Sequence, residues 1–306
     1  SELGQLTNLG SIALNQNQLS GSIPASLGQL TNLVELHLHQ NQLSGSIPTE
    51  LGQLSQLTRL LVHQNQLTGA IPSELGQLSK LAILYLHQNE LSGSIPASLG
   101  QLSNLIQLFV HENQLTGSIP SSLGQLSNMT HLVLSFNSLS GEIPTEFGQL
   151  SSLSKLFARD NLLTGSIPAE LAQASSLTEL HLAGNQLSGS IPTALTQLAN
   201  LVILDLLNNN LTGSLPAFGQ SVVVTVDLPP PEETPTPTAP PAVTDQLADI
   251  NGDIDAIEAI EIVEGQAPSD DVVNQVGNAL DKTNALAQQV TETLPEGEAG
   301  VGVALT

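Results

Sequence analysis

Leucine recurs in a fixed pattern along the first two thirds of the chain. In the copy LVELHLHQNQLSGSIPTELGQLSQ (33–56), Leu36 and Leu38 alternate with outward-facing residues, as in a short strand with one buried face. The pattern returns every 24 residues in nine copies. A period of this length indicates a solenoid, in which each coil buries its apolar face only against its neighbours. Equivalent strands of successive coils are then expected to stack in parallel, about 4.8 Å apart.

One asparagine in each copy recurs at the same 24-residue interval. These residues are Asn17, Asn41, Asn65, Asn89, Asn113, Asn137, Asn161, Asn185 and Asn209. A turn must follow each strand, and we expect the amide of Asn41 to bond the backbone groups exposed there, within its own coil and the next. Gly45 and Pro48 then shape the return, and Leu51 and Leu54 bring the chain back into the core.

The pattern L-x-x-L-x-L-x-x-N-x-L followed by S/T-G-x-I-P, over residues 1–216, resembles the plant-type leucine-rich repeat. That class is found in plant receptor ectodomains and polygalacturonase-inhibiting proteins. The resemblance implies an α/β solenoid, a right-handed coil of repeats with a parallel sheet on its concave face. It also implies a non-enzymatic binding module, secreted or at the cell surface. The chain has no cysteine, whereas the caps of plant relatives usually carry disulfides.

The repeat, and the position at which it stops, divide the sequence into four predicted parts. We expect the solenoid over 1–228, with a capping strand in 221–228, then a Pro-rich linker over 229–244. An acidic amphipathic helical segment is expected over 245–296, and a flexible tail over 297–306. The opening SELGQLTNL aligns with residues 25–33, which suggests that an earlier coil preceded it.

Charge restricts the partners. The chain carries 28 acidic residues against five Lys and Arg, a net charge of −23, which disfavours nucleic acid and anionic membranes. No apolar run is long enough to cross a membrane, and no cofactor is expected. A protein or peptide ligand is the expected partner, and the tail helices are candidates for self-association.

The first outward column of the predicted strands varies from copy to copy. It reads Ala13, His37, Leu61, Tyr85, Phe109, Val133, Phe157, His181 and Asp205. An exposed apolar strip of this kind usually marks a contact site, whereas the alternative is drift on a solvated surface. Because these side chains should point away from the core, replacing one should weaken binding and leave stability almost unchanged.

The second outward column contains four consecutive histidines. It reads Asn15, His39, His63, His87, His111, Ser135, Arg159, Ala183 and Leu207. His37, His39 and His63 could supply three metal ligands, but no carboxylate stands at a matching step to orient their rings. We therefore expect hydrogen bonding to a ligand, with binding that changes between about pH 7 and 5.5.

Three of the four basic residues in the repeats, Arg59, Lys155 and Arg159, fall in columns of the predicted concave face, and they complete the predicted site. The site comprises Arg59, His63, Tyr85, His87, Phe109, His111, Val133, Phe157, Lys155 and Arg159. In plant peptide receptors of this class, two arginines two residues apart can hold a peptide's C-terminal carboxylate. The matching positions are Phe157 and Arg159, so half of that motif is missing.

A second hypothesis rests on hydroxyl rows. The residue before the repeat glycine is always Ser or Thr, and the residue after it is Ser in seven of nine copies, with Ala70 and Glu142 as exceptions. Regular rows of this kind could bind an ordered lattice such as ice, although solenoid twist opposes a long flat match. No catalytic set converges in a pocket, so the sequence does not indicate an enzyme.

Overall fold

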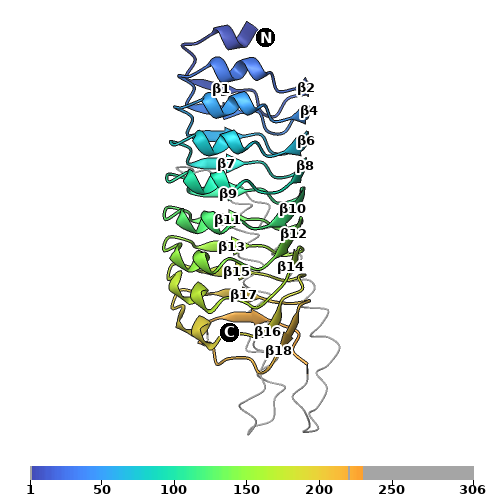
Figure 1. Ribbon diagram of the computed structural model, residues 1–306, viewed down its shortest axis with the longest axis vertical. Coiled ribbons are helices and arrows are strands. Elements are labelled where there is room, and N and C mark those ends of the chain that lie inside the picture. Colours follow the sequence, from blue (N-terminus) through green and yellow to red (C-terminus); the bar gives the residue numbers. More distant parts are fainter. Residues whose placement is uncertain (1, 220, 230–306) are drawn as a thin grey trace.

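The computed structural model describes residues 2–219 and 221–229, which form one stack of coils (Figure 1). The predicted helical segment, the tail and nearly all of the linker lie outside the described residues. The parallel stacking predicted from the leucine period is confirmed, because equivalent positions such as Leu36 and Leu60 lie side by side in neighbouring strands.

The largest sheet, here called the main sheet, has ten parallel strands, one from each coil and one more at the end. Its strands are β1 (Ser11–Ala13), β3 (Glu35–His37), β5 (Arg59–Leu61), β7 (Ile83–Tyr85), β9 (Gln107–Phe109), β11 (His131–Val133), β13 (Lys155–Phe157), β15 (Glu179–His181), β17 (Ile203–Asp205) and β19 (Val223–Thr225). Val224 of β19 is buried at the end of the core.

A second parallel sheet runs along the stack, although the sequence did not suggest one. It contains β2 (Ser20–Ser22), β4 (Gln42–Ser46), β6 (Gln66–Ala70), β8 (Glu90–Gly93), β10 (Gln114–Ser118), β12 (Ser138–Gly141) and β14 (Leu162–Leu163). After a break, β16 (Ser188–Ser190) pairs with β18 (Asn210–Thr212). The sequence predicts only that Gly45 and Pro48 shape the return of the chain. Gly45 has a φ of +75° and extends the ladder, since glycine adopts that region without strain.

The return segments are 3-10 helices. They are η1 (Glu2–Gln5), η2 (Ala25–Gln29), η3 (Thr49–Gln53), η4 (Ser73–Gln77), η5 (Ala97–Gln101), η6 (Ser121–Gln125), η7 (Thr145–Gln149), η8 (Ala169–Gln173) and η9 (Thr193–Gln197). No α-helix occurs within residues 2–219 and 221–229, so the α part of the predicted α/β class is corrected there. A 24-residue coil leaves too few residues for α-helical turns, and 3-10 helices serve as short pieces.

Close coil stacking depends on glycine in η1–η7, whereas Ala172 and Thr196 take its place in η8 and η9. A Cβ on Gly52 would lie 2.5 Å from the carbonyl oxygen of Glu74 in the next coil. The helices therefore approach each other with almost no side chain between their backbones, which keeps the coils evenly spaced.

The asparagine column ties each coil to the one before it. The amide of Asn41 donates to the carbonyls of Leu38 and His39 in its own coil, at 3.0 and 3.2 Å. It also donates to Leu14 of the preceding coil at 2.9 Å and accepts from the Leu19 N–H at 3.0 Å. Bonding within its own coil is confirmed, but the other coil is the preceding one and not the next. The asparagine of the next coil, Asn65, bonds to Leu38 and Leu43 of this coil in the same way, so one side-chain amide joins each pair of neighbouring coils.

Candidate functional site

The outward residues of the main sheet form a second apolar cluster, separate from the core. It contains Leu61, Ile83, Tyr85, Phe109, Val133 and Phe157. Tyr85 and Phe109 stack with ring centroids 4.4 Å apart and an interplanar angle of 10°. The predicted direction of these side chains is therefore confirmed, and we call this surface the main-sheet face.

The predicted exposure of this strip is wrong. Tyr85 and Phe109 are only 2% and 4% exposed, and Val133 and Phe157 are buried as well. Stacking hides a broad face of Tyr85 and of Phe109, because neighbouring strands bring the two rings into contact. Replacing Phe109 should consequently cost stability as well as binding, contrary to the expectation from the sequence.

The histidine ladder exists as the repeat predicts. The ring centroids of His39 and His63 lie 4.4 Å apart, and the next two steps, to His87 and then to His111, measure 4.3 Å each. The rings are nearly parallel, with interplanar angles of 11–16°. The ladder stands beside the apolar cluster, since Tyr85 meets both His63 and His87 edge-on.

The imidazoles of His87 and His111 are held neutral. Burial, together with the charges that His111, His63 and His39 would carry, places the pKa of His87 well below its ordinary value. Burial and the neighbouring His63 lower the pKa of His111 to about 4. The predicted change of charge between pH 7 and 5.5 is therefore wrong for His87 and His111. Each offers one N–H donor and one acceptor at neutral pH.

Polar atoms at the centre of the face have no hydrogen-bond partner. Both ring nitrogens of His111 and the hydroxyl of Ser135 are buried without one, and so is Nδ1 of His87. The three residues stand on consecutive coils in one column. A buried polar group without a partner costs roughly 1–3 kcal/mol, so the fold alone gives no reason to keep these groups.

Two predicted cations have acidic neighbours that sequence reasoning missed. Arg159 donates from Nε to Asp160 Oδ2 at 3.0 Å, and its guanidinium lies 5.3 Å from the ring centroid of Phe136. Arg59 lies 3.8 Å from Glu35. Glu35 could have been found, because it stands one 24-residue step before Arg59 in the same column.

A charged chain closes the C-terminal end of the face. Lys155 Nζ lies 2.7 Å from Glu179, whose other oxygen lies 3.5 Å from Nε2 of His181. Burial alone would raise the pKa of Glu179, but a hydrogen bond from His181 and the nearby Lys155 lower it to about 2. Asp205 lies beyond His181 and accepts a hydrogen bond from Thr225. Lys155 is thus engaged within the sheet, which reduces what it can offer a ligand.

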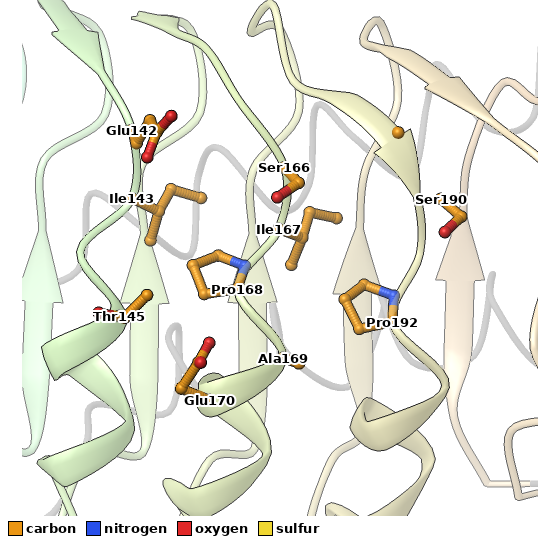
Figure 2. A pocket seen from close by; sticks show the side chains of 11 residues that line it. Glu142, Ile143, Thr145, Ser166, Ile167, Pro168, Ala169, Glu170, Ser190 and Pro192 are labelled. Carbon is orange, nitrogen blue, oxygen red and sulfur yellow. The ribbon is translucent and has the colours of Figure 1, made fainter.

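A hollow of about 490 Å³ lies elsewhere, between the Ile-Pro turns of three successive coils. Figure 2 shows the side chains that line it, among them the carboxylates of Glu142 and Glu170, the isoleucines Ile143 and Ile167, and the prolines Pro168 and Pro192. None of the predicted site residues lines it. Glu142 takes the place that Ser holds in most copies, and its side chain lies over Gly165, where the second sheet ends.

The described part of the chain contains neither a grouped set of metal ligands nor a membrane-spanning helix. No three His, Cys, Asp or Glu side chains in residues 2–219 and 221–229 are grouped to hold a metal ion. Over the same residues, no helix is long and apolar enough to span a membrane.

Several solved structures that the chain resembles are plant receptors. The chain is 37% identical to the plant peptide hormone receptor RGFR1 in complex with RGF2, with a TM-score of 0.68, covering 74% of this chain and 41% of that one. It is 40% identical to the Arabidopsis receptor kinase HAESA ectodomain in complex with an extended IDA peptide hormone, with a TM-score of 0.68, covering 72% and 37%. The chain thus spans about two fifths of the length of these receptor chains.

A third relative has a different role. A plant ice-binding protein is 32% identical, with a TM-score of 0.63, and the match covers 72% of this chain and 70% of that one. No curated protein matches the sequence. The profile of the Leucine Rich Repeat family matches residues 32–54, 56–78, 80–102, 104–126, 128–150, 176–198 and 200–221. These matches cover about half of the sequence, and the chain belongs to the leucine-rich-repeat family.

Proposed function

We propose that this chain is a non-enzymatic binding module that holds a protein or peptide segment on its main-sheet face, outside the cytoplasm. The observation that carries the proposal is the set of buried, unpartnered polar atoms of His111 and Ser135 beside the stacked rings of Tyr85 and Phe109. Aromatic anchors flanked by hydrogen-bonding groups are typical of binding hot spots. Several solved relatives are complexes with peptide hormones, which supports a peptide as the ligand class.

The chemistry of the face favours a ligand rich in backbone amides. Neutral imidazoles and a hydroxyl both donate and accept, so His87, His111 and Ser135 can bond peptide N–H and C=O groups. The apolar cluster then accommodates one or two side chains of the ligand. An acidic group would lie near Arg159, at the end of the same column.

Ser135→Ala is the sharpest test, because it should raise stability and weaken binding at once. The change removes a buried hydroxyl that has no partner in the fold but should bond the ligand. Phe109→Ala should cost about 2 kcal/mol or more of binding, as interface anchors do. Peptides selected from a displayed random library with the intact chain would serve as ligands, with dissociation constants and melting temperatures measured together.

Thr116→Ala, on the second sheet, is the matched control and should change neither quantity much. Peptides that bind Ser135→Ala and Phe109→Ala as tightly as the parent would refute binding at this face. A loss of binding that only follows unfolding would refute it as well.

The hydroxyl rows support ice binding as a second candidate. In the second sheet, the Ser after one glycine lies beside the Ser or Thr before the next, as in Ser22 with Ser44 and Ser118 with Ser140. Thr116 and Ser118 are exposed on β10. One solved relative is an ice-binding protein. Ala70 and Glu142 interrupt the row that follows the glycine, so on β2–β12 this row is regular at Ser22, Ser46, Ser94 and Ser118 only.

A measurement of thermal hysteresis tests whether the hydroxyl rows bind ice. If the rows bind ice, the intact chain should show hysteresis that falls sharply in Thr116→Tyr and Ser118→Tyr, because bulky rings disturb the regular surface. Phe109→Ala, on the other sheet, should retain it. An intact chain that shows no hysteresis would remove the candidate.

A further inference from the structure

Two copies of the motif Asn-x-Ser/Thr have no part in the proposed function. They are Asn128-Met129-Thr130 and Asn210-Leu211-Thr212. In secreted proteins this motif accepts N-linked glycans, because the carboxamide nitrogen of its asparagine receives the sugar. The motif is short and recurs by chance, so the surroundings of each asparagine have to show whether it is a suitable acceptor.

The polar side chains of the first motif take part in the fold. Asn128 is exposed, but its amide donates to the carbonyl of Ser103 in the preceding coil at 2.9 Å. The same bond between coils recurs at three equivalent positions, from Asn32, Asn104 and Asn200. Thr130 is half-buried, and its hydroxyl donates to the carbonyl of Ile106 at 3.2 Å and lies 2.8 Å from Nδ1 of His131. Both groups that define the motif are therefore engaged.

The second motif presents its polar side chains to solvent. Asn210 and Thr212 are exposed on β18, whereas Leu211 between them is buried, so the two polar side chains lie on one outward face. Within residues 2–219 and 221–229 neither side chain forms a hydrogen bond. Their neighbours on β16 are Ser188 and Ser190, which are exposed and small, so they leave room for a bulky group.

We propose that Asn210 carries an N-linked glycan and that Asn128 does not. This inference rests on the location outside the cytoplasm given in the proposed function, because such glycans are added to secreted chains. The donor is an oligosaccharide joined to a lipid through pyrophosphate. Its first sugar forms a C–N bond with Nδ2 of Asn210, while the bond from that sugar to the pyrophosphate oxygen breaks. The proton that Nδ2 loses balances the charge on the released lipid pyrophosphate.

The fold accounts for the difference between the two asparagines. Attachment at Asn128 disturbs a bond that joins two coils, at roughly 0.5–1.5 kcal/mol, and the Thr130 hydroxyl that completes the motif is held by Ile106. Attachment at Asn210 breaks no hydrogen bond of the described residues, since the side chain already points into water. A glycan therefore costs stability at the first motif and nothing at the second.

The position of the glycan limits where partners can bind. It would cover Ser188 and Ser190 at the C-terminal end of the second sheet, because they lie beside Asn210 and Thr212. The main-sheet face and strands β2–β12 would stay accessible. Contacts with a partner are thus excluded only from the last two coils of the second sheet.

Mass mapping of the chain purified from the cells that make it tests the proposal. Peptide-N-glycosidase in heavy-oxygen water converts a glycosylated asparagine into labelled aspartate, and a sample without the enzyme corrects for spontaneous deamidation. We expect the label at Asn210 in most molecules and at least severalfold less at Asn128. In the same cells, Thr212→Ala should remove the label from Asn210. Thr212→Ser keeps the motif and is the matched control, which should retain it.

The outcomes separate this inference from the proposed function. A chain recovered outside the cells without label at Asn210 overturns the glycan and leaves the proposed function standing. Equal labelling of Asn128 and Asn210, or label that survives in Thr212→Ala, overturns the inference as well. A chain found only in the cytoplasm overturns the glycan and the proposed location together. Peptide binding is measured on the other sheet, so its failure in a glycosylated chain counts against the proposed function alone.

Discussion

Replacing Asn113 by alanine is expected to lower the free energy of unfolding by several kcal/mol. Its amide donates to the carbonyls of Leu86, Val110 and His111, each at 3.1 Å, and accepts from the Leu91 N–H at 3.0 Å. Alanine leaves the Leu91 N–H without a partner, which costs roughly 1–3 kcal/mol. The three carbonyls keep bonds from Asn89, Asn137 and the Gln88 N–H, so each loses one of two donors, at roughly 0.5–1.5 kcal/mol per bond. Chemical denaturation followed by circular dichroism measures the loss.

Asn17→Ala is the matched control in the first coil. Asn17 donates only to Leu14 and Asn15, at 3.2 and 2.9 Å, and it is exposed. Water can replace these bonds, so the expected loss is about 1 kcal/mol or less. Equal losses in the two variants would contradict the role assigned to the column.

Acid is expected to destabilise the solenoid well before its carboxylates titrate. The pKa values of His111 and His131 are each lowered to about 4, mainly by burial, and that of His87 is lowered further. The unfolded chain takes up protons on these residues below about pH 6.5. The folded chain does not, so stability is fully present above that pH and falls as pH drops from 6.5 to 4, by about 1.4 kcal/mol per histidine and pH unit.

Melting temperatures recorded from pH 8 to pH 4 test this expectation. The curve should be flat above pH 7 and fall steeply below 6.5. His111→Gln removes one of the buried bases, so its curve should fall less steeply than that of the parent over the same range. Parallel curves for the two proteins would show that His111 does not cause the loss. Below pH 4 the lowered pKa of Glu179 should extend the fall, because its ionised form stabilises the fold.

The parts of the fold that the sequence predicted are those with a strict period. Leucine spacing predicted the main sheet, and the asparagine column predicted the bonds at the turn. The direction in which Asn41 bonds could not be predicted, because both neighbouring coils offer the same backbone groups. The second sheet was missed for a related reason: Gly45 is typical of a turn, and only contact with the next coil extends it into a ladder.

The sequence predicted that the candidate residues lie on the outer face of the main sheet, because alternation along a strand determines which side chains leave the core; that this face is a binding site stays a prediction. Its burial was not predictable, since exposure depends on what lies over the sheet. Charge pairs such as Lys155 with Glu179 were visible at a 24-residue step and were overlooked. The pKa values of the histidines follow from burial and could not be known earlier.

The backward reach of each asparagine gives the solenoid a direction. The side-chain amide of each asparagine bonds only within its own coil and to the coil before it, whereas the N–H of Leu43 is satisfied by the asparagine of the next coil. As the ribosome releases the chain, every new coil finds its docking surface already in place, so folding can keep pace with synthesis. For such a protein, translation itself supplies the order of assembly, and refolding of the complete chain from denaturant has to establish that order by chance encounters.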